Sequence, residues 1–151
     1  MRPAGRAASS PARSSRARVL LVRCSVITSI PRPGAPPESA DFYGGIFIVT
    51  QQGGITDLKL SEPLTGCPKA GKASAAAGKK SRKLWGNGKG SFRTSGKYSA
   101  ATVRGTIWLV QDNCTSTLTR VTQGVVSVKD FVTKKSRLLR KGQRYTAKAK
   151  R

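Results

Sequence analysis

The sequence predicts an all-β protein folded as a single antiparallel sandwich or barrel-like domain. From residue 41 onward, short runs rich in β-branched and aromatic residues alternate with turns that contain glycine. Strands at this spacing are typical of sheets that stack in two layers or close on themselves. No apolar run reaches the ~18–20 residues that a membrane-spanning helix needs.

The strands are predicted one after another along the chain. The segment 42–50 is joined to 55–60 by Gln51-Gln-Gly-Gly54, a connection suited to a hairpin. The continuous apolar run Ile107-Trp-Leu-Val110 predicts a strand buried on both faces. Val126 and Val128 alternate with polar residues, which predicts a half-exposed strand. Further strands are expected at 83–85, 91–94, 98–103, 106–111, 117–122, 125–131, 136–140 and 143–147.

The chain divides by composition into three parts. Residues 1–40 combine arginine, serine and six prolines, which predicts a disordered segment. Its apolar run 19–30 follows an arginine-rich lead, so a degenerate signal region or a mis-assigned start are the alternatives. Residues 41–147 form the predicted β domain, which includes a basic loop at 66–83, and 148–151 form a basic tail.

Charge narrows the classes of partner and reaction. The chain has 29 lysine and arginine residues against 6 acidic ones, for a net charge of +23. Such a field attracts nucleic acid, anionic lipid or acidic wall polymer, although a merely solvated basic surface gives the same composition. The chain contains no histidine, and its carboxylates form no close pairs. We therefore predict a protein that is not an enzyme, without catalytic residues, cofactor or metal ion.

Two cysteines in segments typical of turns predict a disulfide. Cys67 follows Thr65-Gly66, and Cys114 follows Asp112-Asn113. A pair at loop positions of a small β domain is typical of oxidising compartments, whereas two reduced thiols would indicate the cytosol. Cys24 remains unpaired in the segment 1–40.

A basic segment with interspersed aromatic residues is the candidate polyanion patch. We expect Trp85, Phe92 and Tyr98 to point into the core while the cations point outward. The alternative is a single-stranded nucleic-acid platform, in which these rings stack on bases and the cations hold phosphates. The predicted patch consists of Lys79, Lys80, Arg82, Lys83, Lys89, Arg93 and Lys97.

The segment Ala101-Thr-Val-Arg-Gly-Thr-Ile-Trp-Leu-Val110 resembles the core motif of the FecR-type domain. The resemblance extends over about residues 88–147, and it implies an extracytoplasmic β domain that binds a protein or a wall component. The family's known member is an envelope regulator that passes an external signal to a sigma-factor system. The residues that match the family motif are Thr102, Val103, Arg104, Gly105, Thr106, Trp108, Gly124, Val126, Val128, Gly142 and Gln143.

Two functions remain open at this point. The first is a secreted or cell-surface FecR-like module that binds a protein or an anionic envelope polymer, with a role in cell-surface signalling. The second is a cytosolic β-barrel that binds nucleic acid through the basic and aromatic surface. The two hypotheses place the protein in opposite compartments.

Overall fold

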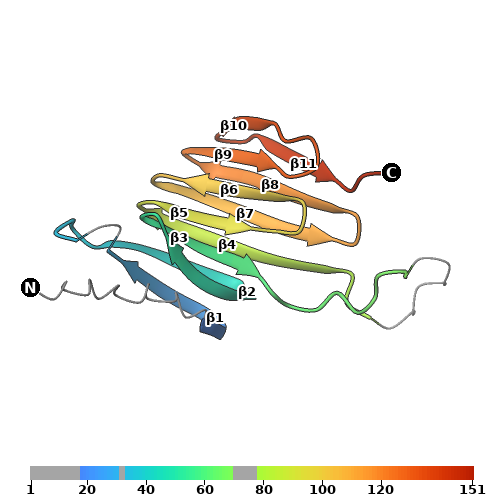
Figure 1. The fold of residues 1–151 in the computed structure, drawn as a ribbon, viewed down its shortest axis with the longest axis horizontal. Helices are drawn as coiled ribbons and strands as arrows, with labels where there is room; N and C mark the ends of the chain where they lie inside the picture. Colours follow the sequence, from blue (N-terminus) through green and yellow to red (C-terminus); the bar gives the residue numbers. More distant parts are fainter. Residues whose placement is uncertain (1–17, 31–32, 70–77) are drawn as a thin grey trace, which may run out of the picture.

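The computed structural model of the protein describes residues 18–30, 33–69 and 78–151. These ranges form an all-β fold of eleven strands (Figure 1). They contain no helix long and apolar enough to cross a membrane. The strands are β1 (Arg18–Ser29), β2 (Glu38–Gln52), β3 (Ile55–Leu60), β4 (Ser81–Lys89), β5 (Phe92–Ser95), β6 (Ser99–Val103), β7 (Thr106–Asn113), β8 (Ser116–Gln123), β9 (Val125–Asp130), β10 (Ser136–Arg140) and β11 (Arg144–Lys148).

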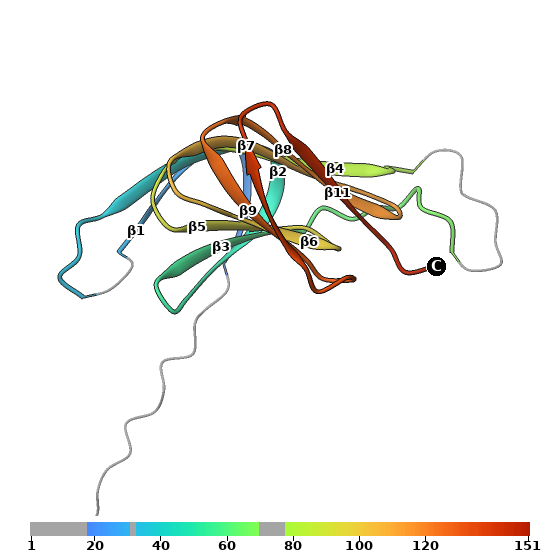
Figure 2. The same cartoon turned by 90° about the horizontal axis from the view of Figure 1, so that it is seen from above.

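All strands belong to one nearly closed sheet. Their order is β10-β9-β6-β5-β3-β2-β4-β7-β8-β11, and β1 pairs with β2 on its other edge. Figure 2 shows the sheet folded over, with β4, β7 and β8 in one layer and β3, β5 and β6 in the other. The pairing is antiparallel, as predicted, except between β3 and β5, which run parallel. They run parallel because the chain crosses to the other layer as β4 before it returns as β5.

The long strand β2 joins the two layers. Its residues 39–43 pair with β4, whereas residues 47–52 pair with β3. Gly44 lies between the two halves with φ of +87°, a conformation that favours glycine. Before this point the even-numbered residue Phe42 faces inward, and after it the odd-numbered residue Phe47 does. Both halves of β2 therefore direct a phenylalanine into the core.

Four aromatic side chains form the centre of the core. Phe42, Phe47, Phe92 and Trp108 are all fully buried. The Phe42 ring meets those of Phe92 and Trp108 edge to face, at centroid distances of 5.6 and 5.8 Å. The Trp108 Nε1–H donates a hydrogen bond of 3.1 Å to Thr94 Oγ1, which satisfies the one polar group of the indole. The prediction that the 107–110 strand is buried agrees with its Trp108, Leu109 and Val110.

Gly86 makes room for the Trp108 ring. The two residues face each other in the β4–β7 pairing. A Cβ atom added at position 86 would lie 2.3 Å from Cζ2 of the indole, too close for any side chain. The strand β4 therefore passes directly beneath the ring, and this close contact packs β4 against the core.

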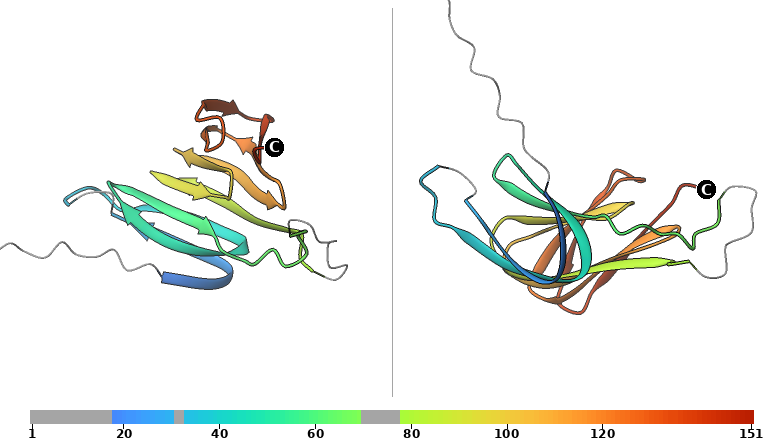
Figure 3. Two further views of the ribbon diagram at one scale, coloured as in Figure 1. Left: turned by 45° about the vertical axis from the view of Figure 1, so that its right-hand side comes forward. Right: turned by 90° about the horizontal axis from the view of Figure 1, so that it is seen from below.

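The splayed strands β10 and β11 cover the seam of the barrel. They follow each other in the chain, yet β10 pairs with β9 and β11 pairs with β8 (Figure 3). In the turn between them, the Gly142 amide donates to the Val121 carbonyl, and the Val121 amide donates to the Gln143 carbonyl. This Gly-Gln turn attaches one end of the seam to β8.

The residues of the FecR-like motif divide between core and turns. Val103, Trp108, Val126 and Val128 are core residues, and Thr106 is buried beside them. Arg104 and Gln143 are exposed, and Thr102 is half-buried on the outer face. The motif glycines Gly105, Gly124 and Gly142 occupy turns with positive φ. The motif thus describes the architecture of the domain.

The N-terminal boundary of the domain differs from the prediction. Residues 1–40 were expected to be disordered, but β1 spans Arg18–Ser29 and β2 begins at Glu38. The strand β1, whose sequence is apolar and β-branched, pairs along β2, and without it β2 would have an open edge. The disorder expected for residues 1–17 lies outside the described residues.

Replacement of Gly86 by alanine should destabilise the domain by about 1–3 kcal/mol, as overpacking of a well-filled core does. Equilibrium denaturation with urea measures the change, with the exposed Lys83→Ala on the same strand as control. A Gly86→Ala variant as stable as the control would contradict the close packing of Trp108 on β4.

Candidate functional site

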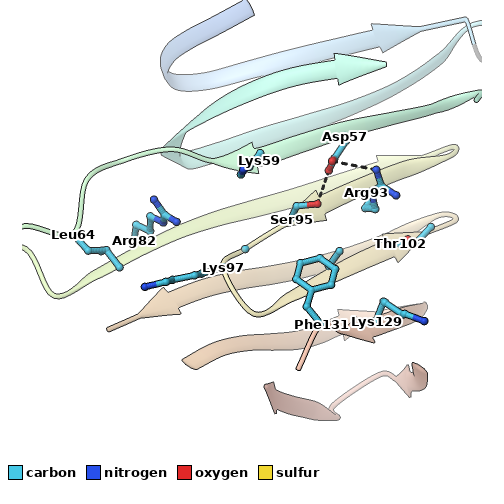
Figure 4. A pocket seen from close by; sticks show the side chains of 12 residues that line it. Asp57, Lys59, Leu64, Arg82, Arg93, Ser95, Lys97, Thr102, Lys129 and Phe131 are labelled. Atoms are coloured by element: carbon cyan, nitrogen blue, oxygen red, sulfur yellow. Dashed lines mark hydrogen bonds and ion pairs between the residues drawn. The ribbon is translucent and has the colours of Figure 1, made fainter. Parts of the chain in front are cut away.

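The candidate site is a groove on the outer face of the β3-β5-β6-β9 layer, with a volume of about 780 Å³. Figure 4 shows its side chains rising from these neighbouring strands and from the segments at either end. The groove is lined mainly by lysine, arginine and small polar residues.

Strand register places the polar side chains in two rows across the groove. One row runs from Asp57 through Arg93 to Thr102, and the other runs from Lys59 through Ser95 and Ala100 to Lys129. Their neighbours in sequence, such as Leu58, Thr94 and Val128, point into the core. The two-residue period of the strands therefore gathers these polar side chains on one face.

Three lysines of the groove have no acidic partner. Within the described part of the chain, no carboxylate forms an ion pair with Lys59, Lys97 or Lys129. Asp57 is occupied, because it accepts hydrogen bonds from Ser95 Oγ at 2.7 Å and Arg93 Nη2 at 3.2 Å. The buried Nε of Arg93 has no partner in the structure. The groove thus carries unneutralised positive charge.

A buried carboxylate holds one end of the groove. Asp112 is completely buried, and its Oδ2 accepts hydrogen bonds from Arg82 Nε at 2.9 Å. The backbone amide of Lys97 donates to both carboxylate oxygens, at 2.9 and 3.0 Å, and Thr117 Oγ1 donates to Oδ1 at 2.5 Å. A buried charge is tolerated only with such a full set of partners. Asp112 therefore holds the backbone of Lys97 and the side chain of Arg82 in place at this end of the groove.

The segment that follows β3 forms the wall beside this carboxylate. Arg82 Nη1 donates to the Glu62 carbonyl at 2.8 Å, two residues before Leu64, which lines the groove. Cys67 and Cys114 lie at disulfide distance, with Cα atoms 5.3 Å apart, in agreement with the predicted pairing. The Tyr98 hydroxyl donates to the Cys114 carbonyl at 3.2 Å. These contacts anchor the wall to the β7–β8 turn.

A second buried carboxylate shapes the other end, next to Lys129 and Phe131. Oδ1 of Asp130 accepts the backbone amides of Val132 and Thr133, at 2.8 and 2.9 Å, which fixes the turn after β9. Oδ2 accepts the Tyr145 hydroxyl at 2.7 Å from β11. The same carboxylate thus ties the seam of the barrel to the rim of the groove.

The ionisation of Asp130 and Tyr145 reflects this contact. Burial by itself would raise the pKa of Asp130, but the two amides of the turn and the Tyr145 hydroxyl favour the carboxylate and lower its pKa below the usual 3.8. The hydrogen bond to Asp130, together with burial, raises the pKa of Tyr145 above its usual 10.0. Both shifts favour the charged carboxylate next to the neutral phenol.

Only some residues of the predicted polyanion patch lie together in the groove. Arg82, Arg93 and Lys97 line the groove. Lys79 forms an ion pair with Glu62 instead, and Lys83 and Lys89 extend from the outer face of the other layer. Lys59 and Lys129 also line the groove but were absent from the predicted patch, although each lies at an outward position of an alternating strand. Their distance in sequence from residues 79–97 concealed the shared site.

The three aromatic residues of the basic segment also divide. Phe92 lies in the core as expected. Trp85 does not, because its strand turns Leu84 inward and leaves the indole half-exposed on the outer face. Its ring stacks on Tyr43 from β2, with centroids 6.3 Å apart. Tyr98 is half-buried at the turn between β5 and β6.

Comparisons of the chain with protein-family models, curated proteins and solved structures found no match. In the described ranges, no group of three or more cysteine or acidic side chains is placed to hold a metal ion. What the site can do chemically therefore rests on its own geometry, which offers cations and hydroxyls in an open groove.

The substitution Tyr145→Phe removes the hydroxyl that donates a hydrogen bond to the charged carboxylate of Asp130. It should lower the free energy of unfolding by about 1.5–3 kcal/mol near neutral pH. Because the pKa of Asp130 is lowered in the fold, its contribution is present above pH ~4 and is lost as the pH falls below that value. Because the pKa of Tyr145 is raised, its contribution is present below pH ~10 and is lost above.

The difference between wild type and Tyr145→Phe should therefore be largest between these limits and shrink on both sides. Urea titrations at a series of pH values measure it. A difference that does not change with pH would show that the hydroxyl does not interact with an ionised Asp130.

Loss of the link between Cys67 and Cys114 should cost about 4 kcal/mol for a separation of 47 residues, on the chain-entropy model. The measurement is denaturation of Cys67→Ser/Cys114→Ser against wild type, after non-reducing mass mapping of protein made in an oxidising compartment. Two free thiols at these positions in the wild-type protein would refute the pairing.

Proposed function

We propose that the protein is a non-enzymatic, extracytoplasmic β module that binds an anionic polymer of the cell envelope in the groove. The single observation that carries this proposal is the convergence of Lys59, Lys97 and Lys129 in one groove without acidic partners. Separate strands and a turn supply these cations, so the fold holds them in place.

The form of the groove suits a chain of repeating anions. It is open and lies across four strands, so a polymer can run along it. Ser95 and Thr102 add hydroxyl groups between the cations. A polymer that alternates phosphate groups with hydroxyl-bearing carbons, such as poly(glycerol phosphate), matches this pattern.

Two features support the extracytoplasmic location. The Cys67–Cys114 pair at disulfide distance is compatible with an oxidising compartment. The resemblance to the FecR-type domain points the same way, and on that resemblance a role in cell-surface signalling belongs to the proposal. A protein partner with an acidic surface is the other ligand that the resemblance implies.

Nucleic acid is the competing ligand. Single-stranded binders place stacking aromatic rings in the same groove as their cations. Here Trp85 lies on the outer face of the other layer, and among the described residues Phe131 is the one aromatic residue that lines the groove. The cations of the groove therefore lie apart from the stacked rings of Tyr43 and Trp85, which favours a polymer without bases as the ligand of the groove.

Binding of poly(glycerol phosphate), measured by calorimetry at several salt concentrations, tests the proposal. Lys59→Gln/Lys129→Gln should weaken binding and lower the slope of log affinity against log salt by about one for each lysine removed. The control Lys83→Gln/Lys148→Gln removes the same charge elsewhere and should leave the affinity much closer to wild type.

Equal losses in both double variants would reduce the interaction to nonspecific charge and contradict the groove. Tighter binding of oligo-dT of equal charge, abolished by Trp85→Ala, would favour the nucleic-acid function instead.

A further inference from the structure

A second hollow lies on the outer face of the other layer, beside two stacked aromatic rings. Tyr43 and Trp85 face each other in the β2–β4 pairing, and their rings are nearly parallel, with an interplanar angle of 8°. Cδ1 of the indole lies close over Gly44, where an added Cβ would be 3.5 Å away. Both rings are half-exposed.

Polar side chains continue the same face toward the hollow. Asp41 and Asn87 face each other in the register, two residues along from Tyr43 and Trp85 and thus about 7 Å away. Both are exposed, and they line a hollow of about 400 Å³ together with Lys89 and Gln123. One face of the sheet therefore presents aromatic rings next to a carboxylate and two amides.

Asp41 differs from the other acidic residues. Within the described residues, it is the one carboxylate without a hydrogen bond or ion pair to the protein. The other five, Glu38, Asp57, Glu62, Asp112 and Asp130, are each bonded to an amide, hydroxyl or cation. Its acceptor oxygens are free for a ligand, in a chain whose cations greatly outnumber its carboxylates.

The charge of the hollow separates its ligand from that of the groove. Its one carboxylate, on Asp41, is balanced by one cation, on Lys89. The lining of the hollow thus carries no net charge, in contrast to the unpaired lysines of the groove, and this favours an uncharged ligand. Side-chain amides donate and accept hydrogen bonds and a carboxylate accepts them, so together they are suited to hydroxyl groups, which do both.

We propose that the stacked pair Tyr43–Trp85, together with Asp41 and Asn87, is a binding site for an uncharged saccharide. The C–H face of a sugar ring would lie on the half-exposed aromatic surface, and adjacent hydroxyls would bond to the carboxylate and the amide. An aromatic surface with a few convergent polar groups is the usual composition of a small-ligand site.

The saccharide site and the groove lie on different layers of the sheet (Figure 2). The saccharide therefore does not compete with the anionic polymer, and each site is testable with the other removed. This inference does not depend on the function proposed for the groove.

Tryptophan fluorescence reports on this site directly. The chain has two tryptophans, and Trp108 is fully buried, so quenching by acrylamide reports mainly on Trp85. The probes are the tetrasaccharides of N-acetylglucosamine, cellulose and maltose. At least one of them should protect Trp85 from quenching and give a saturable calorimetric titration.

Variants connect the signal to the named residues. Asp41→Ala and Asn87→Ala should each weaken the binding of that tetrasaccharide by about tenfold, the loss expected for one good hydrogen bond to a ligand. Trp85→Ala, followed by calorimetry, should abolish it. The groove variant Lys59→Gln/Lys129→Gln should bind the tetrasaccharide like wild type. Circular dichroism of each variant checks that it is folded.

Protection by none of the three tetrasaccharides would overturn the proposal. So would protection by oligo-dT in their place, or binding that Asp41→Ala and Asn87→Ala leave unchanged. Loss of binding in the groove variant would show that the two surfaces are not separate sites.

Discussion

The packing of Trp108 is the interaction on which the rest of the fold depends. From β7 its ring reaches Phe42 on β2, lies against Gly86 on β4 and donates a hydrogen bond to Thr94 on β5. One side chain thus connects both layers of the folded sheet. Because β2 also bends at Gly44 to pair with each layer, the two faces are held at a fixed separation, and the outward residues of every strand acquire defined positions.

The few carboxylates act as structural acceptors, and this use leaves the surface cationic. Asp112 and Asp130 are buried and bind backbone amides at the two ends of the groove. Asp57 holds Arg93 and Ser95 within it. With five of the six carboxylates committed to such contacts, Lys79 is the one lysine of the described residues that forms an ion pair. The strand register decides which of the other described lysines share a surface. The register thereby brings Lys59, Lys97 and Lys129 together in the groove.

The two layers present different chemistry on their outer faces. The β3-β5-β6-β9 face combines lysines and hydroxyls, whereas the face of β2 and β4 combines stacked rings, amides and an unpaired carboxylate. The proposals above assign an anionic polymer to the first face and an uncharged saccharide to the second. The Cys67–Cys114 pair at disulfide distance is compatible with an oxidising compartment.

The sequence by itself determined the strands, the core and the cysteine pair. Local alternation and turn residues carry that information, so 55–60, 106–111 and 136–140 were predicted nearly to the residue, and Trp108 was placed in the core. Only the tertiary structure decided that β1 joins the sheet, that Trp85 faces outward, and that Lys59 and Lys129 belong with Arg93. The reason is physical: a strand's period shows that its two faces differ, but the pairing of strands distant in sequence decides which faces share a surface.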